Sequence, residues 1–188
     1  MCLGIQYLHA NRILHRDIKT INMFLTKNDN IKIGDLGVAR ELNQTHNMAH
    51  TVVGTPYYLS PELCEEKPYN NKSDIWSLGC VLYELATLSH PFEAQNQGAL
   101  ILKILRGKYN KIPAIYSLSL QEMIDNLLIK DYRKRPDIDE ILNSPVMIER
   151  MKKLQIECPT SESLKIAPKK DKGPKKDQPK LPLPQPPQ

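Results

Sequence analysis

The segment 73–88 constrains the fold more than any other stretch, because it is apolar on nearly every side. Apolar residues recur at the three- and four-residue spacing of a helix, and others fill positions between them: Ile75, Leu78, Cys80, Val81, Leu82, Leu85, Ala86 and Leu88. A helix that is hydrophobic nearly all round is buried. Ser73 is its expected N-cap, and Asp74 lies in the positive field of the first turn. We therefore expect other elements to surround this helix.

Shorter segments with helical periodicity lie on both sides of the central helix. Residues 1–11 place Leu3, Tyr7 and Leu8 on one face, and Asn11 is the expected left-handed terminator. After the central helix, the spacing of apolar residues predicts four further helices, at about 97–106, 119–130, 136–142 and 146–154.

The composition is that of a soluble globular domain followed by a tail. The chain has 188 residues, of which 40% are hydrophobic and 25% charged. No apolar run approaches the roughly 18 residues of a membrane-spanning helix, and the N-terminus lacks the features of a secretory signal. The 4 cysteines are too widely spaced for a zinc site or a disulfide framework. A reducing compartment is therefore expected, the cytosol or the nucleus.

The last part of the chain differs from the rest in composition. Residues 158–188 are rich in proline and lysine, which predicts a disordered tail after a domain at 1–157. The Pro/Leu run 179–187 is suited to the aromatic grooves of SH3- or WW-type partners. The lysines are suited to acidic partners or a nuclear address, and a merely solubilising tail is an equal alternative. Nucleic-acid binding is not favoured, because no aromatic residues interleave with the lysines.

Eight residues from His15 to Asn22 carry an unusual density of polar side chains. Asp17 is placed to accept a proton from an attacking hydroxyl, Lys19 to neutralise charge on a phosphoryl group, and Asn22 to hold a divalent metal. This set suits phosphoryl transfer, in which catalysis consists mainly of positioning and charge neutralisation. The plain alternative is a polar turn before a strand.

A second candidate metal ligand follows a predicted β-hairpin. The apolar runs 23–26 and 31–34 are joined by an Asn/Asp turn, the pattern of two short antiparallel strands. Asp35 ends the second strand, and Gly37 is expected to let the backbone turn so that the carboxylate faces a metal. The polar stretch 38–56 that follows has no periodicity and predicts a loop.

These motifs, in this order, resemble the C-terminal lobe of eukaryotic serine/threonine protein kinases. The resemblance covers residues 1–157 and is closest to the NIMA-related (Nek) family. It rests on the run from His15 to Asn22 with Met23, Phe24 and Leu25 after it, on Asp35-Leu36-Gly37, on the block 54–62, and on the segment 67–76.

The resemblance implies a mainly α kinase C-lobe with a short β-hairpin, and an ATP- and Mg²⁺-dependent enzyme that phosphorylates protein Ser/Thr hydroxyls. Asp17 would be the catalytic base, and Lys19 would contact the γ-phosphate. Asn22 and Asp35 would bind Mg²⁺, and Phe24 would form the floor under the adenine. We expect no β-rich N-terminal lobe within these 188 residues, because only fourteen of them precede His15 and they contain no Gly-rich loop or V-A-I-K lysine.

The resemblance also implies regulatory and structural roles. Thr51 is the expected activating phosphosite, with Arg16 as the cation for its phosphate; an ordinary loop threonine is the alternative. Thr55 belongs to the expected substrate-binding loop. The remaining expected contacts are a buried ion pair of Glu62 with Arg135, for which a basic surface patch at 133–135 is the alternative, and hydrogen bonds from Asp74 to the catalytic-loop backbone.

Two functions remain open from the sequence. One is an active kinase of which this chain is the C-terminal part. The other is a catalytically inactive C-lobe that serves as a protein-binding module, because the residues that roof the nucleotide are missing. The resemblance adds cytoskeletal or ciliary association to the expected cytoplasmic or nuclear location.

Overall fold

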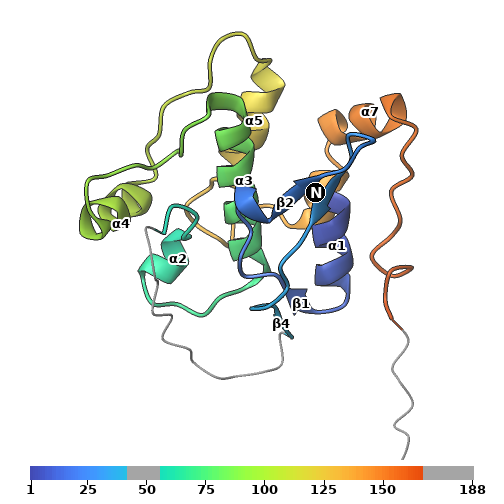
Figure 1. Ribbon diagram of the computed structural model, residues 1–188, viewed down its shortest axis with the longest axis horizontal. Helices are drawn as coiled ribbons and strands as arrows, with labels where there is room; N and C mark the ends of the chain where they lie inside the picture. The colour runs from blue at the N-terminus through green and yellow to red at the C-terminus, as the bar shows by residue number, and fades with distance from the viewer. Residues whose placement is uncertain (42–55, 167–188) are drawn as a thin grey trace, which may run out of the picture.

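The prediction of a mainly helical domain is confirmed. The computed structural model describes residues 1–41 and 56–166. Helix α3 (Asn71–Thr87) runs through the middle of the molecule (Figure 1). Around it lie α1 (Cys2–Ala10), α2 (Pro61–Cys64), α4 (Gln97–Arg106), α5 (Leu118–Leu127), α6 (Ile138–Leu142) and α7 (Pro145–Lys153). No helix in the described ranges is both long and apolar enough to span a membrane.

Helix α3 is buried on two sides, as its sequence predicts. Ile75, Leu78 and Val81 pack into one core cluster, together with residues of α1, α5 and α6. Trp76, Cys80 and Tyr83 pack into a second cluster, which also contains Phe92, Leu100, Ile104, Ile112, Ile124 and Leu128. The exception is the C-terminal end of the helix, where Leu85 is 52% exposed and Leu88 is 91% exposed.

The start of α3 differs from the prediction. Asn70, not Ser73, is the N-cap, because its side chain accepts a hydrogen bond from Lys72 N at 2.8 Å. Ser73 lies one turn further in, where its hydroxyl accepts from Asn70 N and completes a capping box. Ser73 was the wrong N-cap because both residues have capping side chains and the spacing alone did not separate them.

Gly79 on α3 lies against Leu127 and Leu128 at the end of α5. A Cβ at this position would lie 2.8 Å from Leu127 Cβ and 2.8 Å from Leu128 Cδ2. We expect Gly79→Ala to lower the free energy of unfolding by about 1–3 kcal/mol, because it overpacks this contact. Gly98→Ala on α4 is the matched control, since its nearest neighbour, Asn96 Oδ1, is 3.6 Å away. Urea denaturation would contradict the close packing if the two variants were equally stable.

Helix α1 ends differently from the prediction. Ile5 and Leu8 are buried, whereas Tyr7 is 43% exposed, so the buried face is rotated from the one expected. Asn11 has φ −96° and is not left-handed; Arg12, one residue later, takes φ 58°. The Asn11 side chain instead donates to the Tyr7 carbonyl at 2.8 Å, which caps the helix from the side.

Two small antiparallel sheets accompany the helices. The predicted hairpin is confirmed as β2 (Met23–Leu25) and β3 (Ile31–Ile33), with Met23 opposite Ile33. The second sheet, β1 (Ile13–Leu14) with β4 (Arg40–Glu41), has strands of two residues each. Strands this short have no periodicity to read, which explains why the sequence did not indicate them.

The boundary of the folded part lies further along the chain than predicted. Residues 159–166, expected to belong to a disordered tail, pack along α1 (Figure 1). The anchors of this segment include Gln6 on α1 and Asn11 just after that helix, so the proline- and lysine-rich composition after Cys158 did not indicate them. The Pro/Leu run 179–187 and the lysines at 169–180 lie outside the described residues.

Candidate active site

The loop from His15 to Asn22 follows β1 and ends in the 3₁₀ turn η1 (Thr20–Asn22). His15 is fully buried, and its Nε2 lies 3.2 Å from the carbonyl oxygen of Gly34. The backbone N–H of Asp17 donates to His15 Nδ1 at 3.3 Å. Arg16, between them, has φ 69°, a left-handed conformation that costs a non-glycine residue free energy. His15 therefore joins the loop to the end of the β-hairpin.

Asp17, Lys19 and Asn22 meet in one cluster. Asp17 Oδ2 lies 2.8 Å from Lys19 Nζ and accepts a hydrogen bond from Asn22 Nδ2 at 2.9 Å. Asn22 is buried and also donates to the Asp17 carbonyl at 2.9 Å. The Asp17 side chain remains 30% exposed. The cluster is thus rigid on the side of Asn22 and open to solvent at the carboxylate.

Asp35 is connected to this cluster by a hydrogen bond of the preceding residue, Gly34. The N–H of Gly34 donates to the Asn22 carbonyl at 2.9 Å. Asp35, the next residue, therefore lies where the end of the hairpin contacts the loop. Asp35 itself makes the sharp turn, with φ 59°, and its Oδ1 accepts from Gly37 N at 3.1 Å. Gly37 follows in a turn, as expected, which a hydrogen bond from Ala39 N to the Leu36 carbonyl closes at 3.0 Å; an added Cβ at Gly37 would lie 3.0 Å from Asp35 Oδ1.

The donor set fits a magnesium–nucleotide site. The Asn22 amide nitrogen is committed to Asp17, so its Oδ1 faces away and accepts no hydrogen bond from the described residues. Asp35 supplies an exposed carboxylate. Mg²⁺ prefers hard oxygen ligands and takes one or two from the protein and the rest from phosphates and water. Among the described residues, no group of three His, Cys, Asp or Glu side chains forms a self-sufficient metal site.

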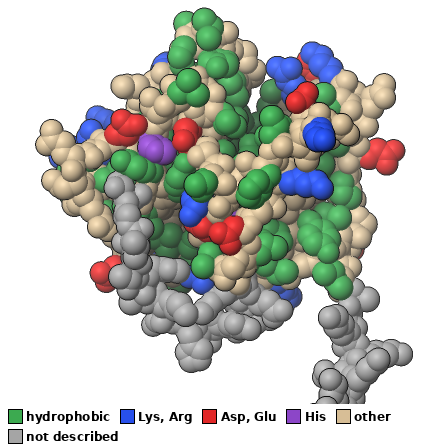
Figure 2. Space-filling view, viewed as in Figure 1, with side chains coloured by type: hydrophobic (Ala, Val, Ile, Leu, Met, Phe, Trp, Pro, Cys, Tyr) green, Lys and Arg blue, Asp and Glu red, His purple; other side chains and the backbone are tan. Residues whose placement is uncertain are grey.

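Apolar side chains are exposed next to these polar groups. Phe24 on β2 is 55% exposed, and its ring lies against Gly34, where a Cβ would come within 2.5 Å. Leu36, the middle residue of the Asp-Leu-Gly motif, is 53% exposed. Figure 2 shows apolar side chains among charged ones over this face; those of the hairpin region are Phe24, Leu25, Ile31, Leu36 and Val38.

Asp74 holds the backbone of the loop from His15 to Asn22. Its carboxylate accepts hydrogen bonds from His15 N and Arg16 N, each at 3.0 Å. His9 Nε2 lies 2.8 Å from Asp74 Oδ2, and the Tyr69 hydroxyl donates to Oδ1 at 2.5 Å. Burial raises the pKa of Asp74, but these hydrogen bonds outweigh it and leave the pKa below its usual value.

Two residues of this network, His9 and Tyr69, were missed by sequence reasoning. His9 lies on α1, 65 positions before Asp74, and nothing in its local pattern separates it from an ordinary helix-end histidine. Burial, and then the nearby carboxylate of Asp74, raise the pKa of the Tyr69 hydroxyl well above its usual value, so it stays a donor. The Arg16 guanidinium lies 5.6 Å from the centre of the Tyr69 ring.

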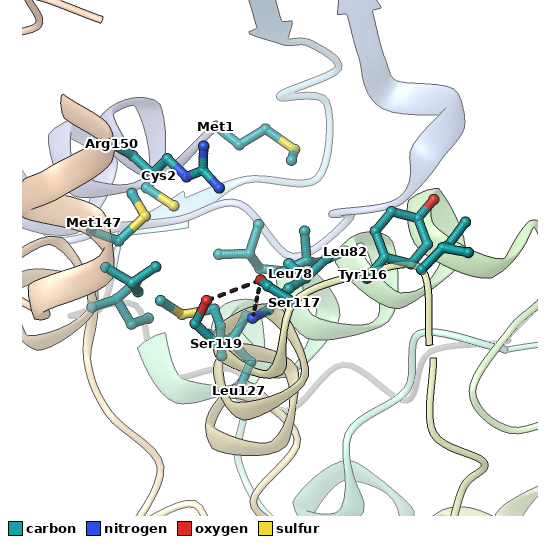
Figure 3. Close-up of a pocket in the computed structure, with 15 residues that line it drawn as sticks. Met1, Cys2, Leu78, Leu82, Tyr116, Ser117, Ser119, Leu127, Met147 and Arg150 are labelled. Carbon is teal, nitrogen blue, oxygen red and sulfur yellow. Dashed lines mark hydrogen bonds between the residues drawn. The ribbon is translucent and has the colours of Figure 1, made fainter. Parts of the chain in front are cut away.

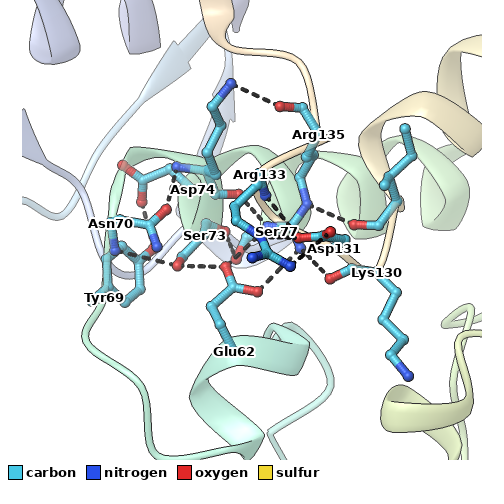
Figure 4. A network of polar contacts seen from close by, with 12 residues as sticks. Glu62, Tyr69, Asn70, Ser73, Asp74, Ser77, Lys130, Asp131, Arg133 and Arg135 are labelled. Atoms are coloured by element: carbon cyan, nitrogen blue, oxygen red, sulfur yellow. Dashed lines mark hydrogen bonds and ion pairs between the residues drawn. The ribbon is translucent and has the colours of Figure 1, made fainter.

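Glu62 and Arg135 form a buried two-pronged ion pair (Figure 4). The Nη1–Oε1 distance is 3.0 Å and the Nη2–Oε2 distance 3.1 Å, and both residues are about 1% exposed. Arg135 also donates to the Lys72 carbonyl at 2.5 Å and to the Ile129 carbonyl at 2.9 Å, and Ser73 donates to Glu62 Oε1 at 2.7 Å. The pair ties α2 to α3 and to the segment before α6.

The lowered pKa values of Glu62 and Asp74 lead us to expect a loss of stability in acid. Burial raises the pKa of Glu62, but the hydrogen bonds and charge of Arg135 bring it below the ordinary 4.5, and that of Asp74 lies below 3.8. A carboxyl with a lowered folded-state pKa stabilises fully above its unfolded-state pKa and loses that contribution as the pH falls through the folded-state pKa. Stability should therefore decline from about pH 4.5 downward.

Glu62→Gln should make this acid dependence shallower, because one of the titrating groups is gone. Urea midpoints at about pH 6 and about pH 3 measure the effect. Glu157→Gln, at an exposed glutamate, is the control and should keep the wild-type dependence. An unchanged dependence in Glu62→Gln would contradict the assignment.

A second polar network, also missed from the sequence, joins η1 to α3. Tyr58 donates to Glu84 Oε2 at 2.5 Å, and the Thr20 hydroxyl lies 3.0 Å from that of Tyr58. Thr20 Oγ1 is also 3.3 Å from Glu84 Oε1. Burial, followed by the Glu84 hydrogen bond, raises the pKa of Tyr58 to about 12, so its proton remains in place. The residue after Lys19 is thereby fixed to the central helix.

Thr51 and Thr55, the predicted phosphosite and substrate-loop threonine, lie outside the described residues.

A cavity of about 380 Å³ lies away from this site, between α1, α3, α5 and α7 (Figure 3). Its lining is mostly apolar and includes Leu78, Leu82 and Met123. Arg150 adds a charged side chain to it. None of Asp17, Lys19 and Asn22 lines it. The residues for which the sequence predicts phosphoryl-transfer chemistry therefore lie outside this cavity.

Comparison with known proteins agrees with the geometry. The protein kinase domain family matches residues 1–147. The chain is 50% identical to mouse serine/threonine-protein kinase Nek1 over 153 residues, which is 81% of this chain and 13% of that protein. It is 52% identical to human serine/threonine-protein kinase Nek5 over 146 residues, 77% of this chain and 21% of that protein.

The chain therefore belongs to the protein kinase family, as a NIMA-related kinase sequence. A third relative, the Dictyostelium discoideum probable serine/threonine-protein kinase nek3, is 52% identical over 149 residues, 77% of this chain and 13% of that protein. The chain spans well under a third of the length of these three relatives.

Proposed function

We propose that this chain carries the catalytic-loop side of an ATP- and Mg²⁺-dependent kinase site that phosphorylates Ser and Thr hydroxyls of proteins. The observation that carries the proposal is the cluster of Asp17, Lys19 and Asn22, in which the carboxylate is held by two neighbours yet open to solvent. Family membership supports the reaction type, and the lysine two positions after Asp17 supports Ser/Thr hydroxyls as acceptors.

Each residue of the cluster has a separate task. Asp17 accepts the proton of the attacking hydroxyl and orients its oxygen. Lys19 neutralises negative charge on the transferred group, since its ammonium lies 2.8 Å from Asp17 Oδ2 at the open edge. Asn22 Oδ1 and the Asp35 carboxylate would hold the metal. When bound, Mg²⁺–ATP supplies the γ-phosphoryl group.

A second candidate function is a non-catalytic protein-binding module. It is favoured by the exposed apolar side chains of the hairpin region, of which Leu25 is 70% exposed and Phe24 is 55% exposed. An apolar surface of this kind is typical of a contact with another polypeptide or lobe. This candidate requires neither nucleotide nor proton transfer.

Transfer of labelled γ-phosphate distinguishes the two functions. The purified chain is incubated with Mg²⁺–ATP and a mixture of unfolded proteins, and phosphoserine and phosphothreonine are quantified. The kinase proposal predicts transfer that chelation of Mg²⁺ abolishes, together with an upward thermal shift on adding Mg²⁺–ATP. Absence of both signals from a folded sample would reject the kinase proposal for this chain and leave the binding module.

A further inference from the structure

Residues 159–166, here named the C-terminal strap, lie along the outer side of α1 (Figure 1). Gln6 Nε2 donates to the Pro159 carbonyl at 3.0 Å, and Asn11 Nδ2 donates to the Leu164 carbonyl at 3.0 Å. Asn11 Oδ1 accepts from the backbone N–H of Ile166 at 2.7 Å. An amide side chain on α1 and one at its C-cap thus hold the two ends of the strap.

The middle of the strap is held by a carboxylate. Asp139 on α6 is partly buried, and both of its oxygens lie 2.7 Å from the Ser161 hydroxyl. Asp139 Oδ1 also accepts from Gln6 Nε2 at 2.8 Å, and Gln6 is only 2% exposed. Ser161, Asp139 and Gln6 therefore form one contact that joins the strap, α6 and α1.

This contact depends on Ser161 being a hydrogen-bond donor. A serine hydroxyl donates to a carboxylate, whereas a phosphoserine at neutral pH has no such donor and carries about −1.5 to −2 charges. Placed against a partly buried carboxylate, a phosphate is repelled and both anions lose hydration. The strap cannot remain seated with a phosphate at this position.

We propose that Ser161 is a phosphorylation site whose modification releases the C-terminal strap from α1 and α6. In the modification, Ser161 Oγ bonds to the γ-phosphorus of ATP in a Ser/Thr protein kinase. The bond from that phosphorus to the β–γ bridging oxygen breaks, ADP leaves, and the hydroxyl proton passes to the catalytic base of that kinase. The modifying enzyme need not be this chain, so the proposal is independent of its activity.

The strap is suited to release because few contacts hold it on the rest of the chain. Its described hydrogen bonds to the rest of the chain come from Gln6, Asn11 and Asp139, and most of its residues are exposed. Segments with so few buried contacts open locally without global unfolding, which gives a kinase access to the hydroxyl. Release exposes the Gln6 and Asn11 side of α1.

Ser163 provides a matched control two residues away. Its hydroxyl donates to the Thr160 carbonyl at 2.7 Å, within the strap itself, and the residue is exposed. A phosphate at Ser163 adds the same charge to the same segment without facing Asp139. The difference between the two positions therefore isolates the contact with Asp139.

The experiment compares full-length chains with phosphoserine installed at position 161 or at position 163. Hydrogen exchange of the strap amides, including the Ile166 N–H, and the rate of tryptic cleavage after Lys165 are measured. Phosphoserine at 161 should accelerate both by about tenfold or more, since it removes a charge-assisted hydrogen bond and adds repulsion. Phosphoserine at 163 should change them by less than about twofold, in line with exposed sites.

A second variant distinguishes repulsion by Asp139 from a general effect of charge. Asp139→Asn retains an oxygen to accept from Gln6 and presents an amide N–H to the phosphate, so it should restore slow exchange in the chain phosphorylated at 161. Equal exchange in phosphorylated and unmodified chains would overturn the proposal. Equal acceleration at 161 and 163, or no rescue by Asp139→Asn, would overturn it as well.

Discussion

Replacing Asp17 by asparagine is expected to lower the rate of phosphoryl transfer by about 10²–10⁴-fold, the usual contribution of a general base. The amide has nearly the shape of the carboxylate but cannot accept the proton of the attacking hydroxyl. With its oxygen in the place of Oδ2, the amide can still accept from Lys19 Nζ and Asn22 Nδ2, so the substitution removes the charge and the basicity while keeping the contacts of the cluster. Initial rates of phosphate transfer at saturating Mg²⁺–ATP measure the effect.

Asp29→Asn is the control for this substitution. Asp29 lies in the exposed turn between β2 and β3 with φ 57°, a conformation that asparagine adopts as readily as aspartate. It should leave both rate and stability unchanged. If Asp17→Asn and Asp29→Asn transfer phosphate at the same rate, Asp17 is not the base, and any measured transfer comes from another group or a contaminant.

Replacing Arg135 by methionine is expected to lower the free energy of unfolding by about 3–5 kcal/mol. The substitution leaves the Glu62 carboxylate buried at about 1% exposure without its cation. It also leaves the carbonyls of Lys72 and Ile129 without their donor and removes a guanidinium 5.0 Å from the centre of the Trp76 ring. Urea unfolding followed by far-ultraviolet circular dichroism measures the loss.

Arg133→Met separates this effect from the loss of a positive charge as such. Arg133 is two residues away, its side chain is 76% exposed, and it pairs with Asp131 at 2.9 Å. An exposed pair of this kind contributes about 1 kcal/mol or less. Glu62→Gln combined with Arg135→Met should recover part of the loss, because the buried charge is then gone. Equal losses in Arg133→Met and Arg135→Met would contradict the role of the buried pair.

The parts of the fold that the sequence predicts are those with a local cause. Helix α3 is apolar on nearly every side, and the β2–β3 hairpin has its turn residues between two apolar runs, so the prediction of either element does not depend on distant partners. The strap boundary depends on Gln6 and Asn11, which lie about 150 positions before it. The proline and lysine content of the segment carries no information about Gln6 and Asn11, so its composition could not indicate that it is anchored.

The site divides in the same way. Asp17, Lys19 and Asn22 lie within one turn-rich segment, and the structure brings Lys19 and Asn22 within hydrogen-bonding distance of Asp17. His9, Tyr69 and Glu84 reach the site from other elements, and their residue types occur at many positions without such a role. The roles of Thr51, Thr55, Phe24 and Asp35 in nucleotide and substrate binding remain predictions that ligand-bound measurements would test.

Two residues beside the candidate catalytic groups, Arg16 and Asp35, hold left-handed backbone conformations at φ 69° and 59°. Each costs about 1–3 kcal/mol and persists only while its surroundings impose it. Asp74 imposes the first through the Arg16 N–H, and the hairpin imposes the second through Gly34. On heating, these two residues should relax before α3 melts. Any catalytic activity should then be lost at a lower temperature than helical structure, and the geometry of this loop would set the upper working temperature.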